Sequence, residues 1–244
     1  MNMNKEIIEH LFEFWKQIGH NGGFLKKEMG FNSTYPSENS WPSKIFNVNV
    51  EALDLKDLEQ KIHSKQLPNS VTVYQQELPE NILTSNGYSL TSTLKAMAFT
   101  INEASYDNIK ESDFLKVCSE NGARLFAQVA SDAFGYPVKT STIIPLYNDP
   151  AFKLFLGKHE DSFPSCGMIY LDKNGVSGIH MIGTKADFRG LGLGKKMTQL
   201  LVNEGIKYQS KEVFLVASNA GERIYTKMGF ETYGVLESYA LQIG

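Results

Sequence analysis

The sequence lacks the features that mark secreted disulfide-rich, membrane-spanning or nucleic-acid-binding proteins. It holds two cysteines in 244 residues, Cys118 and Cys166, too few for a disulfide framework. Its formal net charge of −3 provides no basic field to attract nucleic acid. No stretch approaches the roughly 20 apolar residues that span a bilayer, and Lys5, Glu6 and Glu9 interrupt the first apolar segment. We therefore expect a cytoplasmic protein with no membrane and no nucleic-acid partner.

The composition that is present resembles that of an ordinary folded protein, with 42% hydrophobic and 21% charged residues. A chain of this length can form one large or two small domains and can bury a core without disulfides or metals. The polar stretch at 102–108 has no clear hydrophobic period. It predicts a division between residues 1–105 and residues 106–244.

Hydrophobic periodicity predicts a mixture of helices and strands in both regions. In the first region the expected elements are a helix at 7–18, a loop at 30–43, a strand at 45–50, a helix at 53–63 capped by Asp54, a strand at 71–74 and one or two strands within 88–101. In the second they are helices at 125–134 and 137–147, strands at 152–156, 165–171 and 176–184, a helix after a glycine-rich loop, and a strand at 213–217. This order predicts an α/β fold with a mixed sheet.

The glycine-rich loop lies between the strand that ends at Thr184 and a helical pattern. Gly190, Gly192 and Gly194 can take backbone angles that are closed to other residues, so an anion can approach the main chain closely. The helix behind them begins with unpaired amides and a partial positive charge. A strand, a glycine loop and a helix in this order predict a site for a pyrophosphate.

Two familiar phosphate loops fit this sequence poorly. A Walker loop requires Ser or Thr after Gly-Lys, but Lys196 follows Gly194-Lys195. A Rossmann loop requires Gly-x-Gly-x-x-Gly and an acidic residue at the end of the next strand, and the strand at 213–217 ends in Ala217-Ser218-Asn219. The remaining alternative, a flexible surface loop, is disfavoured by three glycines directly between a strand and a helix.

The loop Arg189-Gly190-Leu191-Gly192-Leu193-Gly194 resembles the Arg/Gln-x-x-Gly-x-Gly/Ala loop of the GCN5-related N-acetyltransferase (GNAT) superfamily. Asn219 and the later block Tyr225-Thr226-Lys227-Met228-Gly229-Phe230 resemble the Asn and Tyr-x-x-x-Gly-Phe block of the same family, in the same order. The resemblance covers residues 110–244, and its specific motifs lie within 179–230. Gly221 departs from the family, which usually has Ala there, and the distance from Asn to Tyr is slightly short.

The resemblance implies that residues 106–244 form a mixed, mostly antiparallel sheet flanked by helices, and that acetyl-CoA, or a related acyl-CoA, is the co-substrate. Residues 1–105 are expected to form a smaller α/β region, with a degenerate copy of the GNAT fold as one alternative. The strand before the loop is expected to splay from the strand at 213–217. The residues expected to contact the cofactor are Ile182, Gly183, Thr184, Arg189, Gly190, Leu191, Gly192, Leu193, Gly194, Lys195, Asn219 and Tyr225.

The expected reaction is attack of a neutral amine on the thioester, with backbone amides near Ile182 stabilising the oxyanion. Tyr225 is the candidate acid for the leaving thiolate, and the alternative for Tyr225 is packing on Phe230. His180 is the candidate base, because alternation predicts that it shares a side of the strand with Ile182 and Thr184. The alternative for His180 is a core histidine.

Three acidic residues, Glu103, Glu160 and Asp161, are further candidates for the base, each with a solvated loop position as its alternative. His159 precedes two of them, but two ligands in one turn do not make a metal site, so no metal is expected.

Together these features predict an acyl-CoA-dependent N-acetyltransferase that acts in a ternary complex on a primary amine of a small molecule or peptide. The alternative is a non-catalytic acyl-CoA sensor on the same scaffold. Residues 1–105 have no such loop, so we expect them to shape the acceptor pocket or the domain interface. The expected assembly is a monomer or homodimer, and the acceptor is left open.

Overall fold

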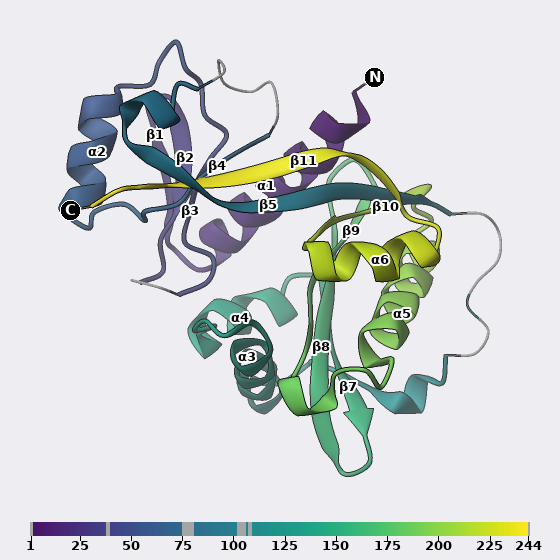
Figure 1. The fold of residues 1–244 in the computed structure, drawn as a ribbon. Coiled ribbons are helices and arrows are strands. Elements are labelled where there is room, and N and C mark those ends of the chain that lie inside the picture. Colours follow the sequence, from purple (N-terminus) through teal and green to yellow (C-terminus); the bar gives the residue numbers. More distant parts are fainter. Residues whose placement is uncertain (1, 38–39, 75–80, 102–105, 107–108, 244) are drawn as a thin grey trace. The chain divides into compact units, whose positions relative to one another are not determined.

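The computed structural model describes residues 2–37, 40–74, 81–101, 106 and 109–243 (Figure 1). It divides the chain into two compact units. The first comprises Met1–Met97, Val216–Glu222 and Thr232–Gly244, and the second comprises Ala98–Leu215 and Arg223–Glu231. The predicted division after residue 105 stays a prediction, because 102–105 and 107–108 lie outside the described residues.

The first unit combines helices with a mostly antiparallel set of strands. Its elements are α1 (Met3–Asn21), β1 (Leu25–Glu28), β2 (Phe31–Thr34), β3 (Lys44–Phe46), α2 (Leu55–His63), β4 (Val71–Tyr74), the 3-10 helix η1 (Thr84–Asn86), most of β5 (Tyr88–Thr100) and most of β11 (Glu231–Leu241). The strands lie in the order β1-β2-β3-β4-β11-β5. Strands β3 and β4 are parallel, whereas β1 with β2, β2 with β3, and β4 with β11 are antiparallel.

Local sequence signals account for the helices of this unit. The helix predicted at 7–18 is confirmed as α1, whose apolar stripe is buried. Asp54 caps α2 as predicted, because its carboxylate accepts the amide hydrogens of Lys56 and Asp57.

Two predictions for the strands of this unit need correction. The loop predicted at 30–43 is wrong over Phe31–Thr34, which form β2. This segment is polar, but it pairs with β1 on one side and β3 on the other, and its Ser33 and Thr34 are fully buried. The strand predicted at 45–50 ends at Phe46, because Asn47 takes a left-handed φ of 55°.

The second unit contains the glycine-rich loop. Its elements are η2 (Glu111–Asp113), β6 (Phe114–Lys116), α3 (Glu120–Phe134), α4 (Thr140–Tyr147), β7 (Phe152–His159), β8 (Ser162–Leu171), β9 (Ser177–Thr184), η3 (Ala186–Phe188), α5 (Leu193–Lys207), most of β10 (Glu212–Ala217) and the second half of α6 (Asn219–Lys227). Its strands lie in the order β10-β9-β8-β7-β6. Strands β9 and β10 are parallel and the other pairs are antiparallel.

Helices cover both faces of this second set of strands. A side chain at Gly183 of β9 would meet Ala133 and Phe134 of α3, whereas one at Gly167 of β8 would meet Met197 of α5. Since Gly183 pairs with Cys166, the neighbour of Gly167, α3 and α5 lie on opposite faces. Figure 1 shows α3 and α4 to one side of β8 and α5 to the other. The predicted α/β class, with a mixed, mostly antiparallel sheet flanked by helices, is confirmed.

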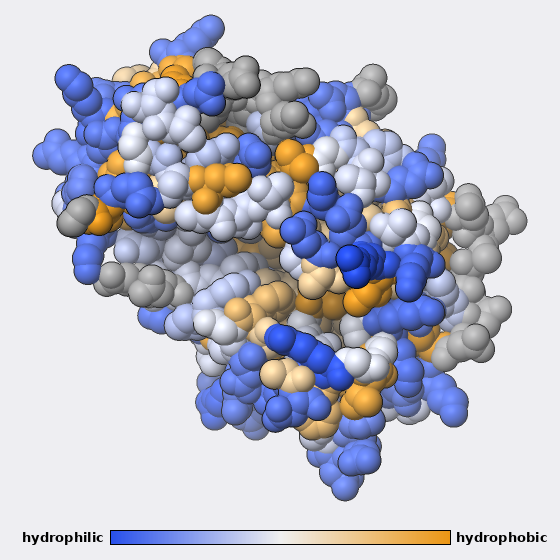
Figure 2. Space-filling view, viewed as in Figure 1, coloured by the Kyte–Doolittle hydropathy of each residue, from blue (hydrophilic) through white to orange (hydrophobic). Residues whose placement is uncertain are grey.

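Exposed apolar side chains come from scattered elements rather than from one surface. Met29, Leu115 and Ile243, for example, lie in a turn, in β6 and near the C-terminal end. On the face drawn in Figure 2, hydrophilic residues interrupt the hydrophobic ones. Single exposed apolar residues of this kind are usual. In the described part of the chain, no helix is long and apolar enough to cross a membrane.

One lysine of the first unit is held in a polar cluster of hydroxyl groups. The Lys44 ammonium donates to Ser70 Oγ at 2.9 Å and lies 3.4 Å from Ser238 Oγ. Ser238 Oγ in turn lies 3.0 Å from Thr72 Oγ1. Burial lowers the pKa of Lys44 to about 8, because these hydroxyl groups do not replace the water that stabilises the charged form.

Lys44→Met should therefore change how stability depends on pH. Between about pH 8 and about pH 10.4 the unfolded chain keeps the Lys44 proton while the folded chain has lost it, so wild-type stability rises with pH in this window. We expect the free energy of unfolding of the wild type, relative to Lys44→Met, to increase by about 2 to 3 kcal/mol across this window. Urea unfolding at both ends of the range measures it, and a difference independent of pH would contradict the lowered pKa.

Candidate functional site

The strand that leads into the glycine loop is aligned by a tight hairpin turn. Asp172 Oδ1 accepts the amide hydrogens of Asn174 and Val176 at 2.8 and 2.9 Å. Gly175 supplies the left-handed φ of 80° that the turn requires. The hairpin predicted from Asp172-Lys173-Asn174-Gly175 is confirmed, and β8 and β9 are antiparallel.

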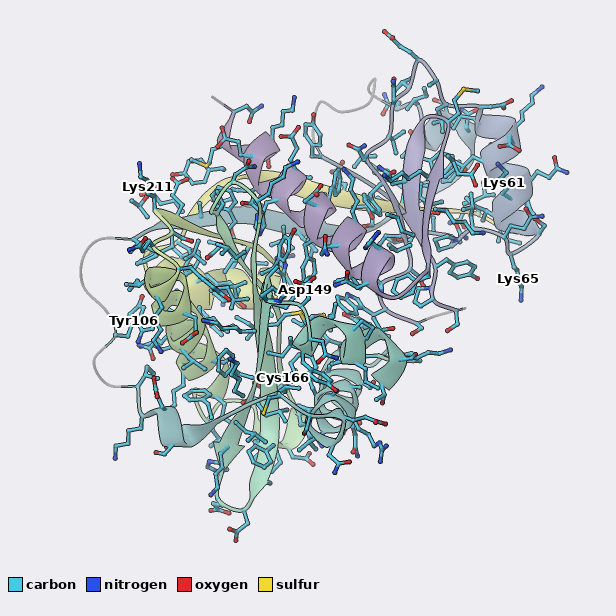
Figure 3. All side chains as sticks on the ribbon, turned by 180° about the vertical axis from the view of Figure 1, so that it is seen from behind. Lys61, Lys65, Tyr106, Asp149, Cys166 and Lys211 are labelled. Atoms are coloured by element: carbon cyan, nitrogen blue, oxygen red, sulfur yellow. The ribbon has the colours of Figure 1, made fainter. Side chains whose placement is uncertain are left out.

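Strand β9 contains one more residue than the stretch of β8 that it faces. Met168 pairs with His180 and Cys166 with Gly183, so Gly167 alone opposes Met181 and Ile182. Met181 absorbs the extra residue with a φ of 55°, a conformation that costs a non-glycine residue about 1 to 2 kcal/mol. The thiol of Cys166, labelled in Figure 3, donates weakly to the Met181 carbonyl at 3.5 Å. The result is a β-bulge directly before the expected cofactor residues.

The bulge overturns the prediction that His180 shares a side of β9 with Ile182 and Thr184. Paired residues of an antiparallel ladder point to the same face, so His180 and Gly183 both lie on the α3 face. Ile182 and Thr184 lie on the α5 face, one residue out of phase. Simple alternation failed because the extra residue at Met181 shifts the phase. His180 is 7% exposed.

The other edge of β9 separates from β10. The two strands pair at Ser177 with Val213 and at Gly178 with Phe214. Among the described residues, β9 has no strand partner on this side beyond Gly178. The backbone of the bulge and of Ile182 therefore lies at an open edge, whose amide and carbonyl groups can bind a ligand.

The glycine loop leads directly into α5. Gly190 and Gly192 have φ values of 84° and 75°, so both positions need glycine. Gly192 is the N-cap of α5, and among the described residues no side chain caps the first amides of the helix. A 15-residue helix with free N-terminal amides favours an anion at this end.

Helix α5 begins beside the expected cofactor residues of β9. A Cβ at Gly194 would lie 3.8 Å from Thr184 Oγ1 and 4.0 Å from Ile182 Cγ2. Leu193 is buried and fixes the first turn, whereas Leu191 is 51% exposed at the tip of the loop. Lys195 is exposed in the first turn, where a cation opposes the helix dipole unless an anion binds. The structure thus places Ile182 and Thr184 next to the start of α5.

The side chain of Arg189 is engaged by backbone carbonyls. Its Nε donates to Thr184 O at 3.3 Å, and its terminal nitrogen donates to Ala133 O at 2.9 Å. The guanidinium therefore binds the end of β9 and the last turn of α3, while the main chain of Arg189 begins the loop.

The spacing of the Tyr-x-x-x-Gly-Phe block corresponds to a helix stop. The Phe230 amide donates to Tyr225 O and the Gly229 amide to Thr226 O, both at 3.0 Å. Gly229 has a φ of 95°, and the Phe230 ring packs on the Tyr225 ring with 5.8 Å between the ring centroids. These are the two hydrogen bonds, the left-handed glycine and the apolar contact of a Schellman cap.

Tyr225 thus packs on Phe230, the contact predicted as the alternative to its role as an acid. Its side chain is half-buried, and burial raises the pKa of its hydroxyl to about 12. The group is therefore protonated throughout the physiological pH range and can donate a hydrogen bond. Its role as an acid stays a prediction.

The remaining predicted residues come from other segments of the chain. Asn219 is the exposed first residue of α6 and belongs to the first unit, whereas the loop belongs to the second. Glu160, with a φ of 51°, and Asp161 form the exposed turn between β7 and β8. Glu103 lies outside the described residues. Within the described ranges no group of three His, Cys, Asp or Glu residues could hold a metal ion.

Sequence reasoning missed the residues that α3 places beside the bulge. Phe134 approaches Gly183, and Tyr136 stacks on Phe134 with a ring separation of 5.5 Å and an interplanar angle of 17°. Burial raises the pKa of the Tyr136 hydroxyl, although the residue is 36% exposed. The sequence marks only the end of α3, through Gly135, whose φ of 75° caps the helix.

Comparisons with known proteins agree with this fold. Residues 145–238 match the family model of the acetyltransferase (GNAT) domain. A GCN5-related N-acetyltransferase from Kribbella flavida has a TM-score of 0.69 and 15% identity, covering 94% of each chain. A putative GNAT-family acetyltransferase from Novosphingobium aromaticivorans has a TM-score of 0.64 and 11% identity, covering 94% of this chain and 96% of that one.

A GCN5-related N-acetyltransferase from Sphaerobacter thermophilus has a TM-score of 0.62 and 15% identity, covering 95% of this chain and 84% of that one. None of the curated proteins compared with the chain matches its sequence. The predicted resemblance is confirmed: residues 145–238 match the GNAT domain, and the chain shares the fold of these GNAT-family structures. The match to this family supports acetyl transfer as the general activity.

Gly183→Ala should disturb the packing of α3 on the bulge. Its Cβ would lie 2.8 Å from Ala133 Cβ and 3.0 Å from Phe134 Cε2, so the helix end must move. We expect a loss of about 1 to 3 kcal/mol in the free energy of unfolding, measured with urea. The matched control is Gly122→Ala in α3, where the nearest atom, on Val117, is 3.4 Å away and helix propensity favours alanine. Equal stability of Gly183→Ala and the wild type would contradict the close approach.

Proposed function

We propose that the chain transfers an acetyl group from acetyl-CoA to a primary amine of a small molecule or peptide, by direct attack in a ternary complex. The observation that carries the proposal is the open edge of β9 beside the uncapped start of α5. The free amides at the start of a helix can bind a pyrophosphate. An open strand edge can form backbone hydrogen bonds with an amide-containing chain that is attached to that pyrophosphate.

In this proposal the amides from Arg189 to Lys195 hold the pyrophosphate of CoA, with Gly190 and Gly192 allowing close approach. The pantetheine arm follows β9 and forms hydrogen bonds with the backbone of 182–184. The thioester carbonyl then lies at the bulge, where an amide near Ile182 stabilises the oxyanion. Donors of this kind contribute about 3 kcal/mol when they are fixed before the reaction.

The reaction exchanges a C–S bond for a C–N bond. A neutral amine attacks the carbonyl carbon, the carbonyl oxygen carries the negative charge, and the CoA thiolate leaves. An alkyl amine with a pKa of about 10.4 is mostly protonated at neutral pH, so a base must take its proton. We assign this role to His180, which lies on the face of β9 opposite the one beside α5, where the cofactor is proposed to bind.

Tyr225 is the proposed donor to the departing sulfur. With a pKa raised to about 12, full transfer of its proton to a thiolate of pKa about 8.5 is uphill by roughly 5 kcal/mol. The hydroxyl therefore acts by donating a hydrogen bond while the C–S bond breaks, and it releases its proton only late in that step. Asn219 at the start of the same helix is the remaining proposed cofactor contact.

Several further assignments rest on the same proposal. The division into residues 1–105 and 106–244 would give the first region the task of shaping the acceptor pocket. The protein would work as a monomer or homodimer in the cytoplasm. A non-catalytic acyl-CoA sensor remains the second candidate, and it would retain the loop while having no need of Tyr225.

Thiol release from acetyl-CoA tests the activity itself. The wild-type protein is assayed with polyamines, amino acids, aminoglycosides and peptides, and mass spectrometry identifies the product. We expect release above hydrolysis with at least one acceptor, and an amide product. Clear binding of CoA without release for any acceptor would favour the sensor instead.

Gly192→Asp should abolish CoA binding, because it places a carboxylate at the proposed pyrophosphate site. Asp is strained at this left-handed φ, so the control has to carry the same strain. Gly175→Asp in the hairpin turn is the matched control, since both glycines have a left-handed φ, of 75° and 80°. We expect affinity to fall about 100-fold or more for Gly192→Asp, as one or two lost charge-assisted contacts imply, and to persist for Gly175→Asp. Calorimetric titration with CoA measures both, and equal affinities would remove the loop assignment.

Tyr225→Phe should lower turnover by about 100-fold, the lower end of the effect of a general acid, while leaving CoA affinity nearly unchanged. Phe keeps the ring contact with Phe230, so folding should not suffer. Because the pKa is raised to about 12, ionisation of Tyr225 should not lower the wild-type rate between about pH 7 and about pH 9. An unchanged rate for the variant would exclude Tyr225 as the donor.

A further inference from the structure

Arg189 links three segments of the second unit through one side chain. Its main chain begins the glycine loop, its Nε donates to the carbonyl of Thr184, and its terminal nitrogen donates to the carbonyl of Ala133. Thr184 is the last residue of β9, and Ala133 lies in the last turn of α3. The guanidinium therefore spans the strand end and the helix end.

The C-terminal end of α3 is well suited to receive this cation. The last four carbonyls of a helix have no intrahelical partner, and Ala133 O is one of them. A positive group there also interacts favourably with the helix dipole. The planar fork of arginine can serve two carbonyls at fixed angles, which the single point charge of lysine cannot do.

A second contact strengthens the same junction. Lys185, the residue after β9, forms an ion pair of 2.8 Å with Asp132 of α3. Residues 132 and 133 are thus bound to positions 185 and 189, next to the close packing between α3 and Gly183. These contacts fix the helix end against the bulge.

The bound helix end carries an aromatic pair. Phe134 packs on Gly183, and Tyr136, just after the cap at Gly135, stacks on Phe134. Both rings come from the α3 face of β9, the face that His180 also occupies. An amine that approaches the carbonyl from this face would pass the exposed ring of Tyr136.

We infer that Arg189 is a positioning residue: its side chain holds the end of α3, with Phe134 and Tyr136, against the bulge of β9, while the loop amides bind the pyrophosphate. The expected kinetic effect rests on the proposed function. Loss of the Arg189 side chain should lower turnover and acceptor binding rather than CoA affinity.

The kinetic test compares Arg189→Ala and Arg189→Lys in the full chain. We expect CoA affinity within about 3-fold of the wild type for both, and kcat/KM for the acceptor about 10- to 100-fold lower, since a misplacement near 1 Å costs this much. Guanidinium ion added at millimolar concentration should partly restore Arg189→Ala, whereas Arg189→Lys should stay impaired. A large loss of CoA affinity with an unchanged acceptor KM would overturn the inference.

Hydrogen exchange tests the positioning without any activity. In unliganded Arg189→Ala we expect faster amide exchange at 133–138 than in the wild type, with α5 unchanged. Arg124→Ala is the matched control, because Arg124 lies on the same helix and binds Glu120 at its other end, on the surface. Unaltered exchange at 133–138 would overturn the positioning role. Absence of thiol release from the wild type would instead count against the proposed function alone.

Discussion

The extra residue at Met181 is the constraint on which the site depends. By taking a left-handed φ of 55°, it lets His180 and Gly183 keep their partners on β8 while Ile182 shifts to the other face. The conformation costs a methionine about 1 to 2 kcal/mol. The surrounding contacts offset it: Cys166 donates to the Met181 carbonyl, and α3 packs directly on Gly183.

Backbone, more than side chains, shapes the proposed cofactor site. The open edge of β9 presents main-chain groups at 182–184, and the start of α5 presents free amides after Gly192. Glycine at 194 leaves the start of α5 without a side chain, and glycine at 183 lets α3 pack directly on β9. Arg189 would then act from the side by fixing α3, which explains why a cationic residue precedes the loop although its guanidinium is bound to carbonyls.

Features that depend on local sequence could be predicted, and features that depend on a distant partner could not. Three segments fix their own backbone through glycines and hydrogen bonds between residues close in sequence: the glycine loop, the turn after Asp172 and the block from Tyr225 to Phe230. The bulge has no such local signal, because it is defined only by the pairing of β9 with β8. The predicted face of His180 was therefore wrong. Strand β2 was missed for the same reason: its polar residues form a strand because β1 and β3 flank them.

The central claim is that CoA binds along the open edge of β9 and the start of α5. Hydrogen exchange with and without CoA tests it most directly. We expect slower exchange at 182–184 and at 190–195 when CoA is present, with no change in the turn at 172–176. Slower exchange confined to other segments, or none at either site despite measured binding, would contradict it.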